Sequence, residues 1–342
     1  GTPPVYIPLS DTGNIIDEIL SYYTDHNSVI AIKAKHAGIS FDIPLATEKD
    51  IGEIIDKLKK KATGLDNMPA KLVKLSKDVI KLPLTKAINF SIESNKFPQL
   101  MKYGKITPIY KSPPDGSRLH KTDHRPVSVL TIFSKIEERY IFNYMIEFTD
   151  HILSDRISAY RKGYSSQHVL LKLTEEWRNH LDNNETVGAV LMDLSKAFDC
   201  LPHELLIAKL AAYGVGKGTL ELLYSYLKER KQSVNIKGKL STFLEILAGV
   251  PQGSILGPIL FNIFINNFVD IFENDDIHNF ADDNTLSAHS RATEEVVKCL
   301  EDESIVAIDW FTDNHMIAIP GKFKAIIIKK DGSDTTGTEL FI

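Results

Sequence analysis

The chain has few cysteines and no long apolar segment. Its 342 residues include two cysteines, Cys200 and Cys299, too few for a disulfide framework or a zinc site. This scarcity is typical of a reducing, intracellular environment. No apolar stretch is long and uninterrupted enough to span a bilayer, and the opening Gly1-Thr2-Pro3-Pro4 is not typical of a signal peptide. We therefore expect an intracellular protein without membrane attachment.

Charge is unevenly distributed along the chain, although the net charge is only −5. From Lys57 to Arg125 there are 16 Lys and Arg against 5 Asp and Glu. From Asn266 to Asp313 there are 2 Lys and Arg against 13 Asp and Glu. This asymmetry suits a phosphate-binding region followed by a cation-binding region, although two solvated surfaces would give the same pattern.

Hydrophobic periodicity predicts a mixture of helices and strands. The predicted helices cover 15–23, 50–61, a segment from about 69 onward, 133–148, 203–213, 219–229, 258–272 and 293–314. The predicted strands cover 105–111, 187–193, 232–236, 242–246, 277–280, 285–288 and 323–328. In the helix that begins near Pro69, we expect Leu72, Leu75 and Val79 to be buried. The order of elements favours an α+β fold with helices on one face of an antiparallel sheet.

Three aspartates follow or join predicted strands. Asp282 and Asp283 lie in the turn of a predicted hairpin, and Asp193 ends an apolar strand. If these strands are neighbours, the three carboxylates meet at one end of the sheet. Carboxylates this close repel one another unless they share cations, and Mg²⁺ prefers a few carboxylates combined with substrate phosphates. An Asp-Asp pair also simply favours a turn, so the pair by itself leaves both interpretations open.

Six segments strengthen the interpretation as a metal site because of their order along the chain. They are Lys61–Asp66, Asp123–Leu130, Arg161–Ser166, Asp193–Asp199, Gly249–Pro258 and Phe280–Asp283. Together they resemble the motifs of reverse transcriptases, and among these the enzymes of non-LTR (LINE-type) retrotransposons. The first two resemble motifs of the fingers, the third resembles the segment before the palm, and the last three resemble the central palm motifs. The resemblance covers about residues 45–330.

The resemblance implies a metal centre built from the three aspartates. Asp193 and Asp282 would bind two Mg²⁺ ions, or Mn²⁺ in their place, and Asp283 would support them. Lys322 resembles the family's lysine near the leaving pyrophosphate, where it would be a candidate general acid. That match is imperfect, because Ile319 and Phe323 stand where the family usually has Asn and Thr.

The resemblance also implies a set of residues that bind the incoming nucleotide. Arg125 would bind the triphosphate through its planar donors, and Lys111 is a further candidate phosphate contact. Phe198 would lie under the sugar and exclude a 2′-hydroxyl. Gln252 would lie near the nucleotide, and Gly253 would let the nucleotide or template approach the backbone.

The fold implied by the resemblance is a right-hand polymerase fold of fingers and palm, with an antiparallel palm sheet. We expect an N-terminal extension over 1–45, fingers with the helices that lead into the palm over 46–185, and a palm over 186–342. No primer-gripping hairpin or helical thumb follows the last predicted strand, so the thumb is expected to be absent from this chain. A fragment and a shortened relict would both have this organisation.

The implied activity is RNA-directed DNA polymerisation, with an RNA template, a DNA primer and a deoxynucleoside triphosphate as partners, in the nucleus, the cytoplasm or both. One alternative is a catalytically inactive module that keeps the fold and binds RNA or DNA. Another is an intron-encoded or telomere-type polymerase. The Thr-Gly-Leu-Asp and Arg-Pro-Val-Ser segments favour the retrotransposon enzymes.

Overall fold

The computed structural model describes residues 14–110, 124–194, 196–272 and 277–330. The chain forms two compact units, and each unit takes two separate stretches of sequence. The first unit combines Gly1–Ile152 with Leu201–Leu260, and the second combines Leu153–Cys200 with Phe261–Ile342. Fingers and palm were predicted as contiguous segments, so these units do not coincide with them, and that division stays a prediction.

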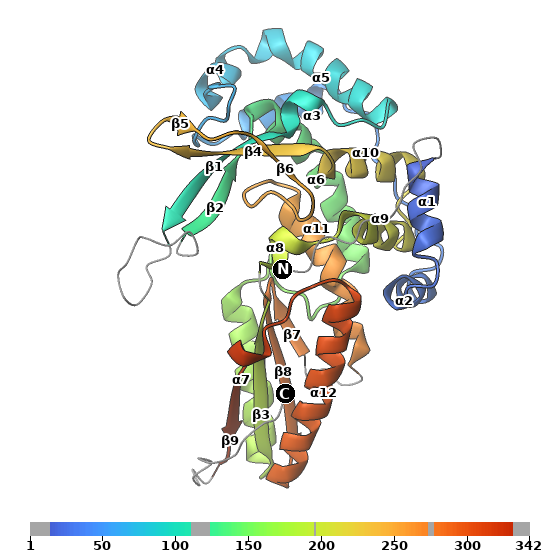
Figure 1. Ribbon diagram of the computed structural model, residues 1–342, viewed down its shortest axis with the longest axis vertical. Helices are drawn as coiled ribbons and strands as arrows, with labels where there is room; N and C mark the ends of the chain where they lie inside the picture. Colours follow the sequence, from blue (N-terminus) through green and yellow to red (C-terminus); the bar gives the residue numbers. More distant parts are fainter. Residues whose placement is uncertain (1–13, 111–123, 195, 273–276, 331–342) are drawn as a thin grey trace. The chain divides into compact units, whose positions relative to one another are not determined.

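The second unit is built on a four-stranded sheet with strand order β7-β8-β3-β9, in which every neighbouring pair is antiparallel (Figure 1). The strands are β3 (Thr186–Asp193), β7 (Ile277–Phe280), β8 (Asp283–Ser290) and β9 (Lys324–Ile328). Its helices are α7 (Ser166–Asp182), α8 (Ala197–Cys200), α12 (Thr293–Asp313) and the 3₁₀ turns η3 (Asn266–Ile271) and η4 (Pro320–Lys322). The sheet therefore brings together strands that lie far apart in sequence.

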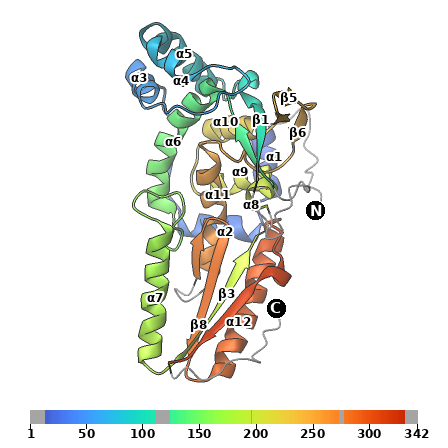
Figure 2. The ribbon, with the colours of Figure 1, turned by 90° about the vertical axis from the view of Figure 1, so that its left-hand side faces the viewer.

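Helices cover both faces of this sheet, and the expectation of helices on one face is wrong here. A Cβ built on Gly188 would lie 2.6 Å from Val296 Cγ1 and 2.7 Å from Leu300 Cδ1, so this face of β3 packs closely on α12. Ser287 of β8 pairs with Ala189, the residue after Gly188, and therefore points to the opposite face of the sheet. There it accepts a 2.9 Å hydrogen bond from Trp177 Nε1 of α7. Figure 2 shows the sheet between these two helices. The continuous apolar run of β3 is typical of a strand that is buried on both faces.

The first unit contains a second sheet with strand order β2-β1-β4-β5, and a short strand, β6, also pairs with β4. The strands are β1 (Tyr103–Tyr110), β2 (His124–Val129), β4 (Arg230–Ile236), β5 (Lys239–Leu240) and β6 (Leu244–Ile246). Its helices are α1 (Ile15–Tyr22), α2 (Asn27–Lys35), α3 (Glu48–Asp56), α4 (Ala70–Leu75), α5 (Lys77–Glu93), η1 (Gln99–Lys102), α6 (Ile132–Ile152), α9 (His203–Ala212) and α10 (Lys217–Leu227). Helix α11 (Gly257–Ile265) crosses the boundary between the units. β1 and β4 are parallel, whereas the other pairs are antiparallel.

Helix α3 confirms the predicted apolar face but ends earlier than predicted. It begins with a capping box, in which the side chains of Thr47 and Asp50 each accept a hydrogen bond from the other residue's backbone N–H. Its buried face consists of Ile51, Ile54 and Ile55. The helix ends at Asp56, and the lysine-rich segment that follows leaves the helical conformation.

The buried stripe predicted after Pro69 is wrong. Leu72, Leu75 and Val79 are exposed, Leu75 by 76% and Val79 by 78%. Ser76 separates α4 from α5, and these helices bury a different set of residues. That set includes Val73, Leu84 and Ile88. Periodicity identifies an apolar stripe, but it does not determine which of two stripes on one helix packs against the core.

Most other predicted elements are confirmed with shifted ends. The helix predicted over 258–272 ends at Ile265 and continues as η3, while helices α2 and α7 were not predicted. In the part of the chain that the structure describes, no helix is both long and apolar enough to cross a bilayer.

Replacing Gly188 by alanine tests the close packing of α12 on β3. The added methyl group meets buried side chains that have little room to move, so we expect the free energy of unfolding to fall by about 1–3 kcal/mol. Gly321→Ala in the same unit is the control, because nothing lies within 4 Å of its Cβ position. Its effect should stay within about 0.5 kcal/mol in the same chemical denaturation experiment. Equal effects of the two variants would contradict this packing.

Candidate active site

The three predicted metal-binding aspartates meet at one end of the sheet in the second unit. Asp193 is the last residue of β3 and lies directly opposite Asp283, the first residue of β8. Asp282 immediately precedes Asp283 in the turn that joins β7 to β8. Directly opposed residues of antiparallel strands have Cβ atoms about 4.5–5.5 Å apart. The fold therefore gathers three carboxylates at one end of the sheet, although in the part of the chain that the structure describes their oxygen atoms do not all lie within 4.8 Å of one another.

The electrostatics of this cluster are unfavourable without a cation. Partial burial raises the pKa of Asp283 above its usual value, and the nearby charges of Asp282 and Asp193 raise it further. A raised carboxyl pKa means that the ionised form is destabilised where it stands. A divalent cation would remove this cost, which fits the predicted chemistry of the donor set.

Two buried asparagines, which sequence reasoning missed, support the turn that carries Asp282. Asn279 Nδ2 donates hydrogen bonds to the Ala281 carbonyl at 2.7 Å and to Asn284 Oδ1 at 2.8 Å. Asn284 Nδ2 in turn donates to the Asp282 carbonyl at 3.3 Å. Ala281 has a φ of +59°, an uncommon conformation for a residue with a Cβ. Their positions on either side of the Phe-Ala-Asp-Asp segment are visible in the sequence, but the carbonyls that they bind are not.

Lys322 lies beside the aspartates. Its Nζ is 3.8 Å from Asp193 Oδ2, and its side chain is 60% exposed. A bridge between Leu194 and Ala318 holds the chain before η4 against the end of β3. An exposed pair at this distance contributes little stability, so the lysine is available for a second anionic partner.

Phe198 is fixed by two other aromatic rings. It stacks on Phe261 with ring centroids 4.5 Å apart and meets Tyr160 edge-on at 6.1 Å. Burial raises the pKa of Tyr160, and the charge of Asp282 raises it further, so this tyrosine lies within electrostatic reach of the aspartates. The Phe198 ring is only half-buried and therefore presents a rigid apolar surface.

The predicted nucleotide contacts Arg125, Gln252 and Gly253 lie in the first unit, where β2 connects them. The Ser128 N–H donates a 2.7 Å hydrogen bond to the Gln252 carbonyl. Gly253 has a φ of +108°, and a Cβ there would lie 2.7 Å from the Ser128 carbonyl oxygen, so only glycine fits. Arg125 is exposed three residues earlier on the same strand. Lys111 lies outside the described residues.

Comparison with known proteins identifies the family. Residues 110–331 match the family model described as reverse transcriptase (RNA-dependent DNA polymerase). The chain belongs to the reverse transcriptase family. It is 31% identical to the probable RNA-directed DNA polymerase from transposon BS of Drosophila melanogaster, over 63% of this chain and 24% of the relative. It is 29% identical to the RNA-directed DNA polymerase from mobile element jockey of Drosophila funebris, over 72% of this chain and 27% of the relative.

The match confirms the resemblance to reverse transcriptases of non-LTR retrotransposons. The chain spans about a quarter of the length of these curated relatives. The family match gives a reverse transcriptase domain, and such domains generally need divalent metal ions.

Two of the reverse transcriptase motifs predicted from sequence contact each other in the first unit. Asp66 Oδ2 accepts a 2.8 Å hydrogen bond from the Ile132 N–H at the start of α6. A Cβ on Gly64 would lie 2.7 Å from the Leu130 carbonyl oxygen, so the Thr-Gly-Leu-Asp segment packs closely on the end of the Arg-Pro-Val-Ser segment. The aspartate thereby supplies an acceptor to one of the helix's unpaired N–H groups.

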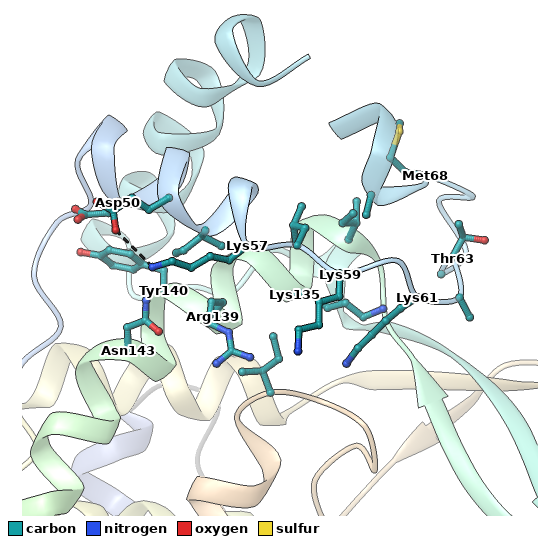
Figure 3. A pocket seen from close by; sticks show the side chains of 18 of the residues that line it. Asp50, Lys57, Lys59, Lys61, Thr63, Met68, Lys135, Arg139, Tyr140 and Asn143 are labelled. Carbon is teal, nitrogen blue, oxygen red and sulfur yellow. Dashed lines mark ion pairs between the residues drawn. The ribbon is translucent and has the colours of Figure 1, made fainter. Parts of the chain in front are cut away.

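Beside this junction the first unit has a basic pocket of about 590 Å³. The cationic residues that line it are Lys57, Lys59, Lys61, Lys135 and Arg139, and the acidic ones are Asp50, Glu53 and Glu147. Figure 3 shows Lys61, Lys135 and Arg139 extending into the same opening, with Asp50 farther along the pocket. Burial lowers the pKa of Lys135, and the nearby Lys61 lowers it further. The basic end of the pocket therefore favours an anionic ligand.

The raised pKa of Asp283 predicts how stability depends on pH. The pKa of the Asp283 carboxyl group is higher in the folded state than in the unfolded state. At pH values between these two pKa values the folded protein binds more protons, and at higher pH the ionised carboxylate lowers the free energy of unfolding. Asp283→Asn should raise the melting temperature at pH 7 in metal-free buffer. This gain should shrink as the pH falls through the raised pKa and vanish below about 4, where the carboxyl group is protonated in both states. Thermal unfolding followed by circular dichroism measures the melting temperatures of both proteins. A lower melting temperature for Asp283→Asn than for the original chain at pH 7 would contradict the account.

Proposed function

We propose that the chain is an RNA-directed DNA polymerase domain with a right-hand fold of fingers and palm. It would add deoxynucleotides to the 3′-hydroxyl of a DNA primer on an RNA template. The observation that carries the proposal is the pairing of Asp193 with Asp283, with Asp282 beside them, in a chain of the reverse transcriptase family.

The aspartates of the second unit would hold a pair of Mg²⁺ ions, or Mn²⁺ in their place. Mg²⁺ keeps several oxygen ligands from water and substrate phosphate, so one or two carboxylates per ion are enough. When bound, two such ions would activate the attacking hydroxyl and stabilise the leaving pyrophosphate. Asp193 and Asp282 would be the direct ligands. Asp283, with its raised pKa, would act as a supporting carboxylate that ionises fully when the cations are present.

The remaining residues of the second unit would orient the substrate. Phe198, held by Phe261 and Tyr160, would meet the sugar edge of the incoming nucleotide. A fixed ring discriminates better than a mobile one because it cannot move aside for a 2′-hydroxyl. Lys322 would donate a proton to the pyrophosphate oxygen as the bond to the α-phosphorus breaks, while the primer oxygen forms the new bond.

The first unit would supply contacts to phosphate. Arg125 would bind the triphosphate with its planar donors, close to the Gln252–Gly253 backbone that β2 holds in place. The basic pocket would bind the backbone of single-stranded RNA template. Its lysines are point charges that recognise phosphate regardless of sequence, as a polymerase requires of its template.

Asp282→Asn tests the catalytic proposal. The substitution removes a negative ligand without changing the size of the side chain, so primer extension on an RNA template with Mg²⁺ should fall at least about 100-fold. Asp302→Asn, the same change at an exposed position on α12, should extend primers like the original chain. The reaction is best run with protein in excess over primer, so that single additions are detected.

The same experiment separates the enzyme from an inactive nucleic-acid-binding module. If the original chain binds the RNA template tightly but adds no nucleotide under these conditions, the enzyme proposal is wrong and the binding module is favoured. Equal extension by the original chain and the Asp282→Asn variant would instead show that the aspartates are not the catalytic centre.

Lys135→Gln tests the interaction with the template. The plot of log affinity against log salt concentration has a negative slope, and removing one cation that neutralises a phosphate should make it shallower by about 0.7 for a single strand. Binding should therefore weaken most at low salt. Lys74→Gln on α4, an exposed lysine outside the pocket, is the control and should leave the slope unchanged. Fluorescence anisotropy of a labelled RNA over a salt series measures both. If the two variants lower the slope equally, the pocket is not a specific phosphate-binding site.

A further inference from the structure

A cluster of two histidines and one glutamate lies at the other end of β3 and β8 from the aspartates. Glu185 Oε2 is 2.7 Å from His180 Nδ1 and 3.1 Å from His289 Nδ1. The two imidazole rings stack with centroids 3.4 Å apart and an interplanar angle of 20°. We propose that these three residues form a binding site for Zn²⁺ that is separate from the catalytic metal centre.

The end of helix α7 brings His180 and Glu185 together. Asn184 has a φ of +58°, and the Glu185 N–H donates a 3.0 Å hydrogen bond to the His180 carbonyl. The Asn184 N–H donates to the Leu181 carbonyl, also at 3.0 Å. These two bonds and the left-handed residue constitute a Schellman motif, a well-ordered way to end a helix. The positions of the first two ligands are therefore determined by the backbone rather than by a mobile loop.

Strand pairing brings in the third ligand. His289 of β8 lies directly opposite Val187 of β3, and Glu185 precedes Val187 by two residues. Glu185 lies just before the first residue of β3, and its 3.1 Å contact with His289 places both on the α7 side of the sheet. The end of α7, the turn after it and β8 thus bring His180 and His289 to the same carboxylate oxygen, Glu185 Oε2.

The donor set and its spacing suit Zn²⁺. All three ligand atoms lie within 4.8 Å of one another. Zinc binds imidazole nitrogen and carboxylate oxygen at about 2.0–2.2 Å in a tetrahedral arrangement, with water taking a fourth position in three-ligand sites. The ligands of such a site lie roughly 3.3 Å apart by that geometry, so a small outward movement of the rings would admit the ion. The side chains are 25–36% exposed, which leaves access for the ion and for a water ligand.

The site differs from the catalytic centre in position and in chemistry. β3 runs over eight residues, and the seven steps from Thr186 to Asp193 correspond to roughly 23 Å at about 3.3 Å per residue. Nitrogen-rich sites select transition metals, whereas an all-carboxylate site suits Mg²⁺. The nearby Asp182 pairs with Lys330 at 3.6 Å and is not needed as a ligand. A bound ion would link the end of α7 to the β3–β8 pair and stabilise the unit.

Zn²⁺ titration of the whole 342-residue chain tests the site. A chromophoric chelator competes for Zn²⁺ while saturating Mg²⁺ occupies the aspartates. We expect one tight Zn²⁺ per chain, a Zn²⁺-dependent rise in melting temperature, and tetrahedral visible bands when Co²⁺ replaces Zn²⁺. His289→Ala and the isosteric Glu185→Gln should each weaken Zn²⁺ binding at least about tenfold and remove the rise in melting temperature.

His168→Ala is the matched control. His168 also lies on α7, and the hydrogen bond described for its ring is to Ser165 rather than to a residue of the cluster. It should bind Zn²⁺ like the original chain, and circular dichroism verifies that every variant is folded. The proposal is overturned if the chain binds no Zn²⁺ in competition with the chelator. It is also overturned if His289→Ala and Glu185→Gln, both folded, bind as tightly as the control. In that case the cluster is a shared hydrogen bond between two histidines and a carboxylate.

Discussion

The antiparallel pairing of β3 with β8 determines where the three aspartates lie. Asp193 faces Asp283 only in this register, and a shift by one residue would turn the Asp193 side chain to the opposite face of the sheet. Packing far from the aspartates holds the register, because Gly188 fits closely beneath Val296 and Leu300 of α12. The apolar contacts that stabilise the second unit therefore also position its carboxylates. The same register sets the position of His289 at the other end of the strands.

The three aspartates stay close together despite the repulsion between their carboxylates, because hydrogen bonds fix the backbone of the turn that carries Asp282. The amides of Asn279 and Asn284 donate to the Ala281 and Asp282 carbonyls, so the backbone of the turn that carries Asp282 is held in place. The raised pKa of Asp283 is the energetic sign of this constraint. Such sites lower stability in the absence of a ligand, which is a common trade-off between stability and function.

Sequence reasoning predicted β3 and the β7–β8 hairpin, because short apolar runs and turn residues are local signals. It predicted the family because six motifs occur in order. It did not predict the support from Asn279 or the cluster around Glu185, since both depend on which carbonyls and strands meet after folding. The exposed Leu75 shows a related limit, because helical periodicity reveals an apolar stripe without its packing partner. The roles of Arg125 and the other site residues stay predictions.

The central claim is that Asp193, Asp282 and Asp283 bind the divalent ions that carry out nucleotide addition. Anomalous X-ray scattering from Mn²⁺ in crystals of the chain with an RNA template, a DNA primer and a deoxynucleotide tests it most directly. We predict Mn²⁺ peaks about 2.0–2.2 Å from the Asp193 and Asp282 carboxylate oxygens, the range for small hard divalent ions. Mn²⁺ bound elsewhere, with these carboxylates free of metal while the primer is extended in the crystal, would contradict the account.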